Sequence, residues 1–196
     1  MADQNLSAFI WSVADLLRGD YKQSEYGTVI LPFTVLRRLD CVLAPTKAAV
    51  LTELATRIKA GVNPEPFLLE KAGGFFYNTS PLDLKTVVGD QDHIGENLRA
   101  YLQAFSPEVR DIFERFDFHI QIDRLAKAGL LYQVTEKFVT IDGEILTKPG
   151  IVRHIYDPTA GTGGMLTVAA EHLEAHNPKA RPVMYGQELN PESYAI

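Results

Sequence analysis

Apolar residues recur at helical spacing through the first part of this sequence. In "LSAFIWSVADLL" (6–17) they fall at i, i+3, i+4 and i+7, the spacing of an amphipathic helix. "EYGTVILPFTVLRRLDCVL" (25–43) and "TKAAVLTELATRIKAG" (46–61) continue the pattern, and Pro32 is expected only in a first turn or at a kink. The pattern therefore predicts three successive helices over these ranges.

Shorter helices are predicted to follow, up to about residue 140. "VNPEPF" (62–67) is predicted to be a loop because of its Asn and Pro content. "SPEVRDIFERF" (106–116) is predicted to be a helix with Ser106 at its N-cap. Gly129 divides "IQIDRLAKAGLLYQVTEKF" (120–138) into a pair of helices. Residues 1–140 are thus predicted to form a mostly α-helical N-terminal domain.

The pattern changes in residues 141–196. Asp-Gly and Pro-Gly pairs interrupt the chain at 142–143 and 149–150. A strand is then predicted at 151–156, a helix at 165–176 and a second strand at 183–187. A strand, a glycine-rich turn, a helix and another strand are typical of the start of a doubly wound α/β domain.

Composition indicates a soluble globular protein. The 196 residues are 46% hydrophobic and 22% charged, and no apolar run approaches the roughly 20 residues that a membrane helix needs. The N-terminus lacks a basic leader, so a cytoplasmic location is expected. The single cysteine, Cys41, excludes an internal disulfide framework and a cysteine-rich zinc site. With a net charge of −6, the chain is expected to need a partner for much of any DNA contact.

The turn between the first strand and its helix reads "DPTAGTGG" (157–164). Gly161, Gly163 and Gly164 permit positive φ and leave backbone N–H groups bare, so a ligand can approach closely. Asp157 adds a carboxylate suited to an ammonium group. Glu188 follows the second strand, where an acid can accept hydrogen bonds from ribose hydroxyls. Ligands of open α/β sheets lie beyond the carboxyl ends of the strands, so the sequence favours a nucleoside ligand here.

Two other interpretations of this turn stay open. The spacing is G-x-G-G and not G-x-G-x-x-G, so a tight strand-to-helix turn without a ligand is one of them. A nicotinamide-dependent oxidoreductase is the other, although the spacing and the Asp-Pro pair at 157–158 argue against it.

Several segments together resemble a known family. "DPTAGTGG" resembles the S-adenosylmethionine-binding motif of amino-methyltransferases that act on DNA. With "GQELNPESYAI" (186–196), and with "LSAFIWSVADLLRG", "YGTVILPFTVLRRLD" and "FDFHIQIDRLAKAGLLYQVTEKF" upstream, the chain resembles the modification subunit of type I restriction–modification systems. The resemblance covers nearly the whole chain.

The resemblance implies a Rossmann-like domain that transfers a methyl group from S-adenosylmethionine to adenine N6 in DNA. It also implies two protein partners, a specificity subunit that reads the DNA sequence and a restriction subunit in the larger complex. By position, the methionine end of the cofactor would be lined by Asp157, Gly161, Thr162, Gly163 and Gly164. Glu188 would hold the ribose.

The sequence departs from the family pattern in two places. The family's catalytic tetrapeptide is Asn-Pro-Pro followed by Tyr or Phe, and it holds the flipped adenine. Asn-Pro occurs here at 63–64, 177–178 and 190–191 without that continuation, so no catalytic residue is assigned and the chain alone is expected to be inactive. A family helix that opens with a Thr-Pro-Arg-Glu-like stretch is also missing after Phe138. Both a truncated gene and a fragment of a longer sequence stay open as explanations.

A non-catalytic function is the alternative hypothesis. In it, the helical residues 1–140 form a module that docks the specificity subunit and DNA. Arg37 and Arg38 either contact phosphate or that subunit, or they belong to a solvated helix face. His172 and His176 are four residues apart on one predicted helix but lack an evident third ligand, so no metal site is expected.

Overall fold

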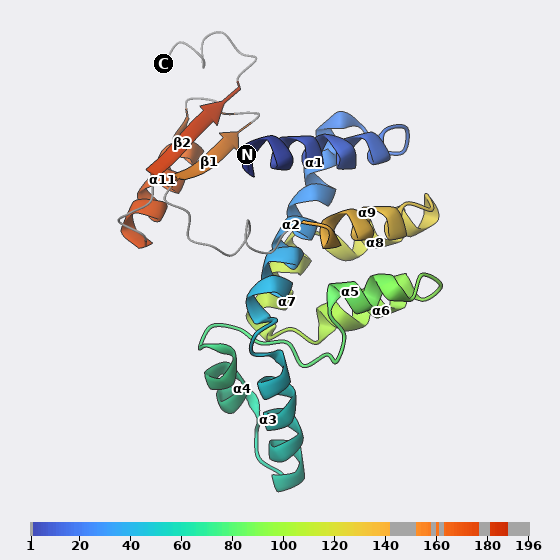
Figure 1. The fold of residues 1–196 in the computed structure, drawn as a ribbon, viewed down its shortest axis with the longest axis vertical. Coiled ribbons are helices and arrows are strands. Elements are labelled where there is room, and N and C mark those ends of the chain that lie inside the picture. The colour runs from blue at the N-terminus through green and yellow to red at the C-terminus, as the bar shows by residue number, and fades with distance from the viewer. Residues whose placement is uncertain (1, 142–151, 158–159, 161–162, 177–180, 188–196) are drawn as a thin grey trace. The chain divides into compact units, whose positions relative to one another are not determined.

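The chain folds into two compact units, Met1–Thr147 and Lys148–Ile196. The structure is a computed structural model that describes residues 2–141, 152–157, 160, 163–176 and 181–187. In the described ranges the first unit is helical, and the second contains two strands and a helix (Figure 1). No helix in these ranges combines the length and the apolar character that a membrane span requires.

The helices of the first unit confirm most of the sequence prediction. Those predicted at 6–17, 25–43 and 46–61 are present, and Gly129 separates the last two helices as expected. The elements are α1 (Ala2–Leu17), the 3-10 helix η1 (Gln23–Glu25), α2 (Tyr26–Leu43), α3 (Lys47–Ala60), α4 (Glu65–Ala72), α5 (Leu84–Gly89), α6 (Ile94–Gln103), α7 (Pro107–Arg115), α8 (Phe118–Lys127) and α9 (Leu131–Val139).

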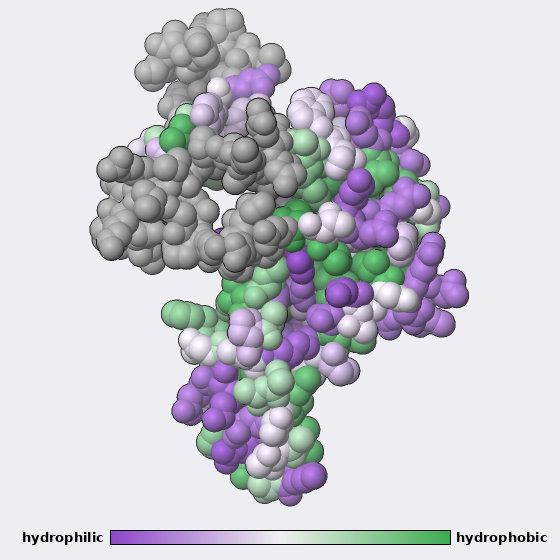
Figure 2. Space-filling model, in the orientation of Figure 1, coloured by the Kyte–Doolittle hydropathy of each residue, from purple (hydrophilic) through white to green (hydrophobic). Residues whose placement is uncertain are grey.

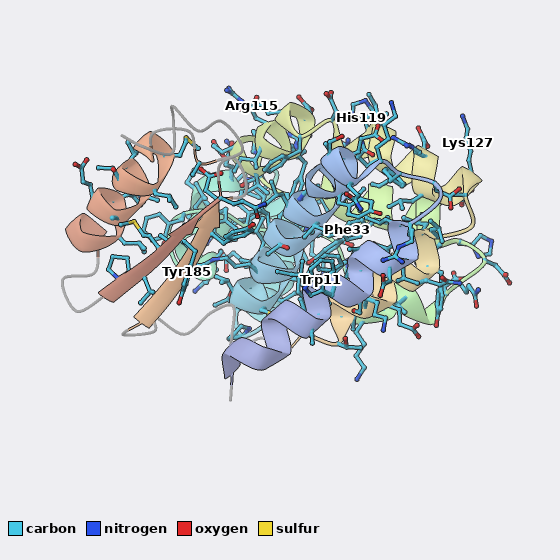
Figure 3. The ribbon with its side chains drawn as sticks, turned by 90° about the horizontal axis from the view of Figure 1, so that it is seen from above. Trp11, Phe33, Arg115, His119, Lys127 and Tyr185 are labelled. Carbon is cyan, nitrogen blue, oxygen red and sulfur yellow. The ribbon has the colours of Figure 1, made fainter. Side chains whose placement is uncertain are left out.

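A cluster of aromatic rings joins α2 to the helices packed around it. Phe33 on α2 is fully buried (Figure 3). Its ring meets the Phe118 ring edge-on, with 4.9 Å between centroids, and stacks on the Phe138 ring at 5.1 Å. Phe9 on α1 contacts the edge of Phe138. Burying such a side chain contributes about 1.5–3 kcal/mol, so this cluster is a main source of stability for the helical unit.

Pro32 lies inside α2 beyond its first turn, so the first of its two expected positions is excluded. Proline in a helix interior removes one backbone hydrogen bond and costs about 3 kcal/mol. Pro32 is buried together with Phe33 and Leu36, so tertiary packing offsets the local cost. Burial in the core, and not helix propensity, therefore explains why a proline is tolerated at this position.

Helices α3 and α4 pack mainly against each other and lie apart from the other helices in Figure 1. Val50 and Leu68 are buried between them, and the Arg57 guanidinium lies 3.6 Å from the centroid of the Phe67 ring. The loop predicted at 62–67 is confirmed for residues 62–64 and wrong for 65–67. Helix α4 begins at Glu65 with prolines at its N-terminus, where a missing N–H is tolerated. Figure 2 shows hydrophilic and hydrophobic residues mixed over this pair.

The second unit contains a parallel strand pair joined by a helix. β1 (Val152–Asp157) pairs with β2 (Arg181–Gly186), and α11 (Gly164–His176) connects them and packs on both. The predicted strand, helix and strand are therefore confirmed. Ile155 is in register with Met184, and Tyr156 is in register with Tyr185.

Candidate functional site

The carboxyl ends of the two strands meet at one edge of the second unit. Asp157, the last residue of β1, is in register with Gly186, the last residue of β2. The Gln187 N–H donates to the Asp157 carbonyl oxygen at 2.8 Å, so the pairing continues one residue beyond β2. The Ala160 N–H in turn donates to the Gln187 carbonyl oxygen at 2.9 Å. These bonds hold the turn that follows β1 against the end of β2.

Gly163 forms the corner between this turn and α11. Its φ of +81° is in the region that favours glycine, and its N–H donates to the Ala160 carbonyl oxygen at 2.8 Å. Its own carbonyl accepts from the N–H and the hydroxyl of Thr167, which begins the helical bonding of α11. Apart from the adjoining backbone, no atom of the described residues lies within 4 Å of where a side chain would start on Gly163 or Gly164. The described part of the chain therefore leaves the backbone at this corner uncovered.

Gly186 is needed for the close approach of the turn to the strand. A Cβ on Gly186 would lie 2.8 Å from the Ala160 Cβ and 3.4 Å from Leu166 Cδ1 on α11. The first distance is shorter than a carbon–carbon contact allows. Sequence analysis did not assign a role to Gly186 or Gln187, although a glycine at the end of the second strand was a usable signal.

A side-chain bond also joins the two strand ends. The Tyr156 hydroxyl donates to Gln187 Oε1 at 2.6 Å. Tyr156 and its register partner Tyr185 are about half exposed, at 58% and 50%. They lie on the sheet face opposite Ile155 and Met184. Gln187 thus contacts β1 through its side chain and through its backbone.

The structure brings together three of the six residues predicted to bind a cofactor. Asp157, Gly163 and Gly164 lie on the turn at the strand edge. Gly161, Thr162 and Glu188 lie outside the described residues. A carboxylate-bearing strand end and an open glycine backbone suit a ligand that carries an ammonium group and hydrogen-bond acceptors.

Among the described residues, no group of three or more His, Cys, Asp and Glu side chains is arranged to hold a metal ion. His172 is exposed on α11. Cys41 is half-buried on α2.

Comparison with known families identifies both parts of the chain. The HsdM N-terminal domain profile matches residues 6–138, and the N-6 DNA methylase profile matches residues 132–196. The chain belongs to the family of type I modification subunits. No curated protein and no solved structure matches it.

The two matches cover different parts of this type I modification subunit and overlap in the last described helix of its first unit. The HsdM N-terminal match contains the helical core around Phe33, and the N-6 DNA methylase match contains the strand edge with Asp157 and Gly163. Both matches include residues 132–138 of α9. The family is that of DNA methyltransferases that act within multi-subunit restriction–modification complexes.

Proposed function

We propose that this chain is part of a site-specific DNA methyltransferase that transfers a methyl group from S-adenosylmethionine to adenine N6. The observation that carries the proposal is the position of the glycine turn. It lies inside the N-6 DNA methylase match, at the carboxyl ends of two parallel strands, and the described residues leave the backbone of Gly163 and Gly164 uncovered. Ligands of parallel α/β sheets bind at this edge.

The proposed cofactor site uses the residues of the turn and of the segment after β2. Asp157 would accept from the methionine ammonium group, and the backbone of Gly161, Thr162, Gly163 and Gly164 would line the methionine end. Glu188 would accept from the ribose hydroxyls. When bound, S-adenosylmethionine supplies the electrophilic methyl group. Gln187 would keep the turn in place through its bonds to Asp157 and Ala160.

The fold proposed for the complete domain is Rossmann-like. The parallel β1–α11–β2 unit supports it, because parallel strands joined by a helix are the building block of doubly wound sheets. The half-exposed Tyr156 and Tyr185 also support it, since both faces of a parallel sheet are normally covered.

In the proposed complex, a specificity subunit reads the DNA sequence and a restriction subunit joins the larger assembly. DNA methylation by this complex would take place in the cytoplasm. The base-holding tetrapeptide Asn-Pro-Pro-Tyr or Asn-Pro-Pro-Phe does not occur in the 196 residues. We therefore propose that the chain by itself binds cofactor without methylating DNA.

Calorimetry with S-adenosylmethionine tests the proposed cofactor site. Asp157→Ala should weaken binding about tenfold or more, the loss expected for a charge-assisted hydrogen bond. Glu171→Ala on α11 is the matched control, because Glu171 is an exposed acid outside the turn and should leave binding unchanged. Binding of NAD in preference to S-adenosylmethionine would contradict the proposal. Incorporation of methyl groups into DNA by this chain alone would contradict the proposed inactivity.

A second candidate function is docking of the specificity subunit and DNA without catalysis. It is supported by the compactness of the helical unit. Met1–Thr147 is compact in itself and contains a buried cluster that runs from Val13 to Ile141. A docking role would need this unit and not the cofactor. The test is co-purification of the specificity subunit with the Asp157→Ala chain in the absence of S-adenosylmethionine. If the two proteins separate, the docking role is wrong.

A further inference from the structure

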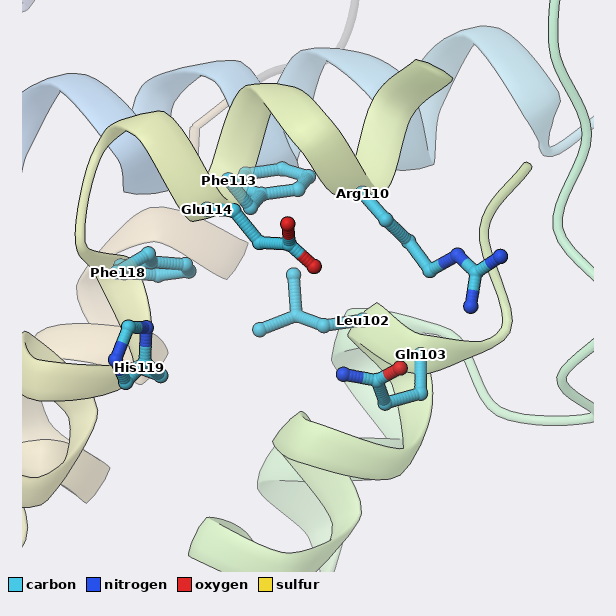
Figure 4. A pocket seen from close by; sticks show the side chains of 7 residues that line it. All are labelled: Leu102, Gln103, Arg110, Phe113, Glu114, Phe118 and His119. Carbon is cyan, nitrogen blue, oxygen red and sulfur yellow. The ribbon is translucent and has the colours of Figure 1, made fainter. Parts of the chain in front are cut away.

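A cavity of about 440 Å³ opens between the end of α6, one face of α7 and the start of α8 (Figure 4). Its apolar lining consists of Leu102, Phe113 and Phe118, which are all buried. The lining also includes the polar residues Gln103, Arg110, Glu114 and His119. Every one of these residues belongs to the helical unit Met1–Thr147.

Arg110 lines this cavity without an anionic partner. Its Nε is buried and has no hydrogen-bond acceptor, and its guanidinium makes no ion pair with another described residue. Arg115 on the same helix, by contrast, pairs with Asp111 at 2.8 Å, and Arg124 pairs with Glu25 at 3.0 Å. A guanidinium that lines a cavity and makes no ion pair with a described residue is suited to pair with an anion from outside.

Glu114 would be the ordinary partner of Arg110, one helical turn away on α7. Figure 4 shows the two side chains extending in different directions, with the Glu114 carboxylate over Leu102. The cavity thus presents an apolar floor, a cation at one side and an acceptor carboxylate near its centre. Its occupant needs an apolar body, a carboxylate for Arg110 and an N–H donor for Glu114.

A protein segment meets these three needs better than DNA does. One peptide carries an apolar side chain, backbone N–H groups and an acidic neighbour within a few ångströms. A DNA phosphate would pair with Arg110, but Arg110 is the one Lys or Arg among the described residues that line the cavity. Binding of a phosphate backbone depends on several Lys and Arg contacts, and an apolar floor adds nothing to it.

We propose that this cavity is a docking site for a partner-protein segment in which an aromatic or large aliphatic residue adjoins a Glu or Asp. The apolar side chain would lie on Phe113 and Phe118, and the acid would pair with the Arg110 guanidinium. Gln103 and Glu114 would bond to the peptide backbone. The site goes beyond the proposed methyltransferase function, because S-adenosylmethionine binding could fail while this site is intact.

The test uses two capped dipeptides of equal size, N-acetyl-Phe-Glu-amide and N-acetyl-Phe-Gln-amide. Each is titrated into the 196-residue chain and followed by NMR on the rings of Phe113 and Phe118. The Glu peptide should bind saturably and about fivefold more tightly than the Gln peptide, as a single charge-assisted bond at a half-exposed site allows. Arg110→Gln should abolish this preference.

Arg115→Gln is the matched control, because it removes an arginine from the same helix outside the cavity lining. It should keep the fivefold preference. Gln103→Trp is a second variant, which fills the rim without changing the core and should reduce binding of both peptides. Equal binding of the two peptides, absence of saturable shifts, or an equal loss in Arg110→Gln and Arg115→Gln would overturn the proposal. So would displacement of the Glu peptide by a short DNA duplex.

Discussion

The Arg37 guanidinium on α2 donates a hydrogen bond of 3.0 Å to the backbone carbonyl of Ile141, which lies 104 residues away in the sequence. The same guanidinium pairs with the Asp40 carboxylate at 2.8 Å. Ile141 is buried just after the end of α9. Arg37 therefore connects Ile141, the last described residue of the helical unit, to helix α2.

Removing this guanidinium should destabilise the helical unit. Arg37→Met keeps most of the apolar stem but leaves the Ile141 carbonyl and part of the Asp40 carboxylate without a donor. The expected loss is about 1–3 kcal/mol in the free energy of unfolding, measured with urea. Arg38→Met changes the neighbouring exposed arginine and should cost less than about 1 kcal/mol, as exposed charges usually do. An equal loss of unfolding free energy in the two variants would show that the bond to Ile141 does not stabilise the helical unit.

The buried Asp40 carboxylate also accepts from Tyr101, and this bond should be measurable. The Tyr101 hydroxyl donates to Asp40 Oδ1 at 2.8 Å, and the Leu84 N–H donates to the same atom at 3.1 Å. Tyr101→Phe should lower the free energy of unfolding by about 1–2 kcal/mol, because the ring stays packed and one bond to a charged acceptor is lost. Tyr132→Phe is the control, since that hydroxyl is outside the core and bonds Glu136 on the same helix.

Tyr101 should also make stability depend on alkaline pH. Burial, followed by the nearby Asp40 carboxylate, raises the pKa of Tyr101 far above its ordinary value of about 10. Above that ordinary value the unfolded chain loses the proton while the folded chain keeps it, so stability should fall as pH rises beyond about 10. The Tyr101→Phe chain should show a smaller fall. An identical fall in both chains would exclude this residue as the cause.

Glu25 should make the stability of the fold decrease as pH falls in the acid range. The Arg124 side chain and then the Lys22 N–H hydrogen-bond this carboxylate and lower its pKa to about 2. The stability it contributes is complete above its unfolded pKa of about 4.3 and is lost as pH falls toward about 2. Glu25→Gln should therefore be less stable than the wild type at neutral pH, with a difference that shrinks below about pH 4.3. Ser24→Ala, which changes no titrating group, should show a constant difference.

Gly186→Ala should loosen the turn without any cofactor present. The new Cβ cannot occupy a position 2.8 Å from the Ala160 Cβ, so the turn or the strand end must move. The amide protons of Ala160 and Gln187 should then exchange about tenfold faster or more, which corresponds to a loss of about 1.4 kcal/mol. Gly164→Ala adds a methyl group in open space and should leave this exchange unchanged. Unchanged exchange in Gly186→Ala would contradict the close packing at this point.

Local patterns in the sequence were enough to predict the elements that carry the candidate site. Alternation of apolar residues and turn-forming pairs placed both strands and α11, and the glycine spacing singled out the turn at Asp157 and Gly163. The same local rules left other points undecided or wrong. They did not predict that Pro32 would lie beyond the first turn of α2, where it is buried with its neighbours, and they extended a loop over residues 65–67, where α4 has already begun.

The sequence by itself determined the helical first part, the strand–turn–helix–strand order that follows, and the family to which these motifs belong, because each depends on residues close together in the chain. Only the tertiary structure decided that Gly186 must lack a side chain and that Arg37 bonds Ile141. It alone also showed that Arg110 lines a cavity with Phe113 and makes no ion pair with another described residue. These relationships join residues that are distant in sequence, or depend on the direction a side chain takes, and periodicity and spacing contain no information about either.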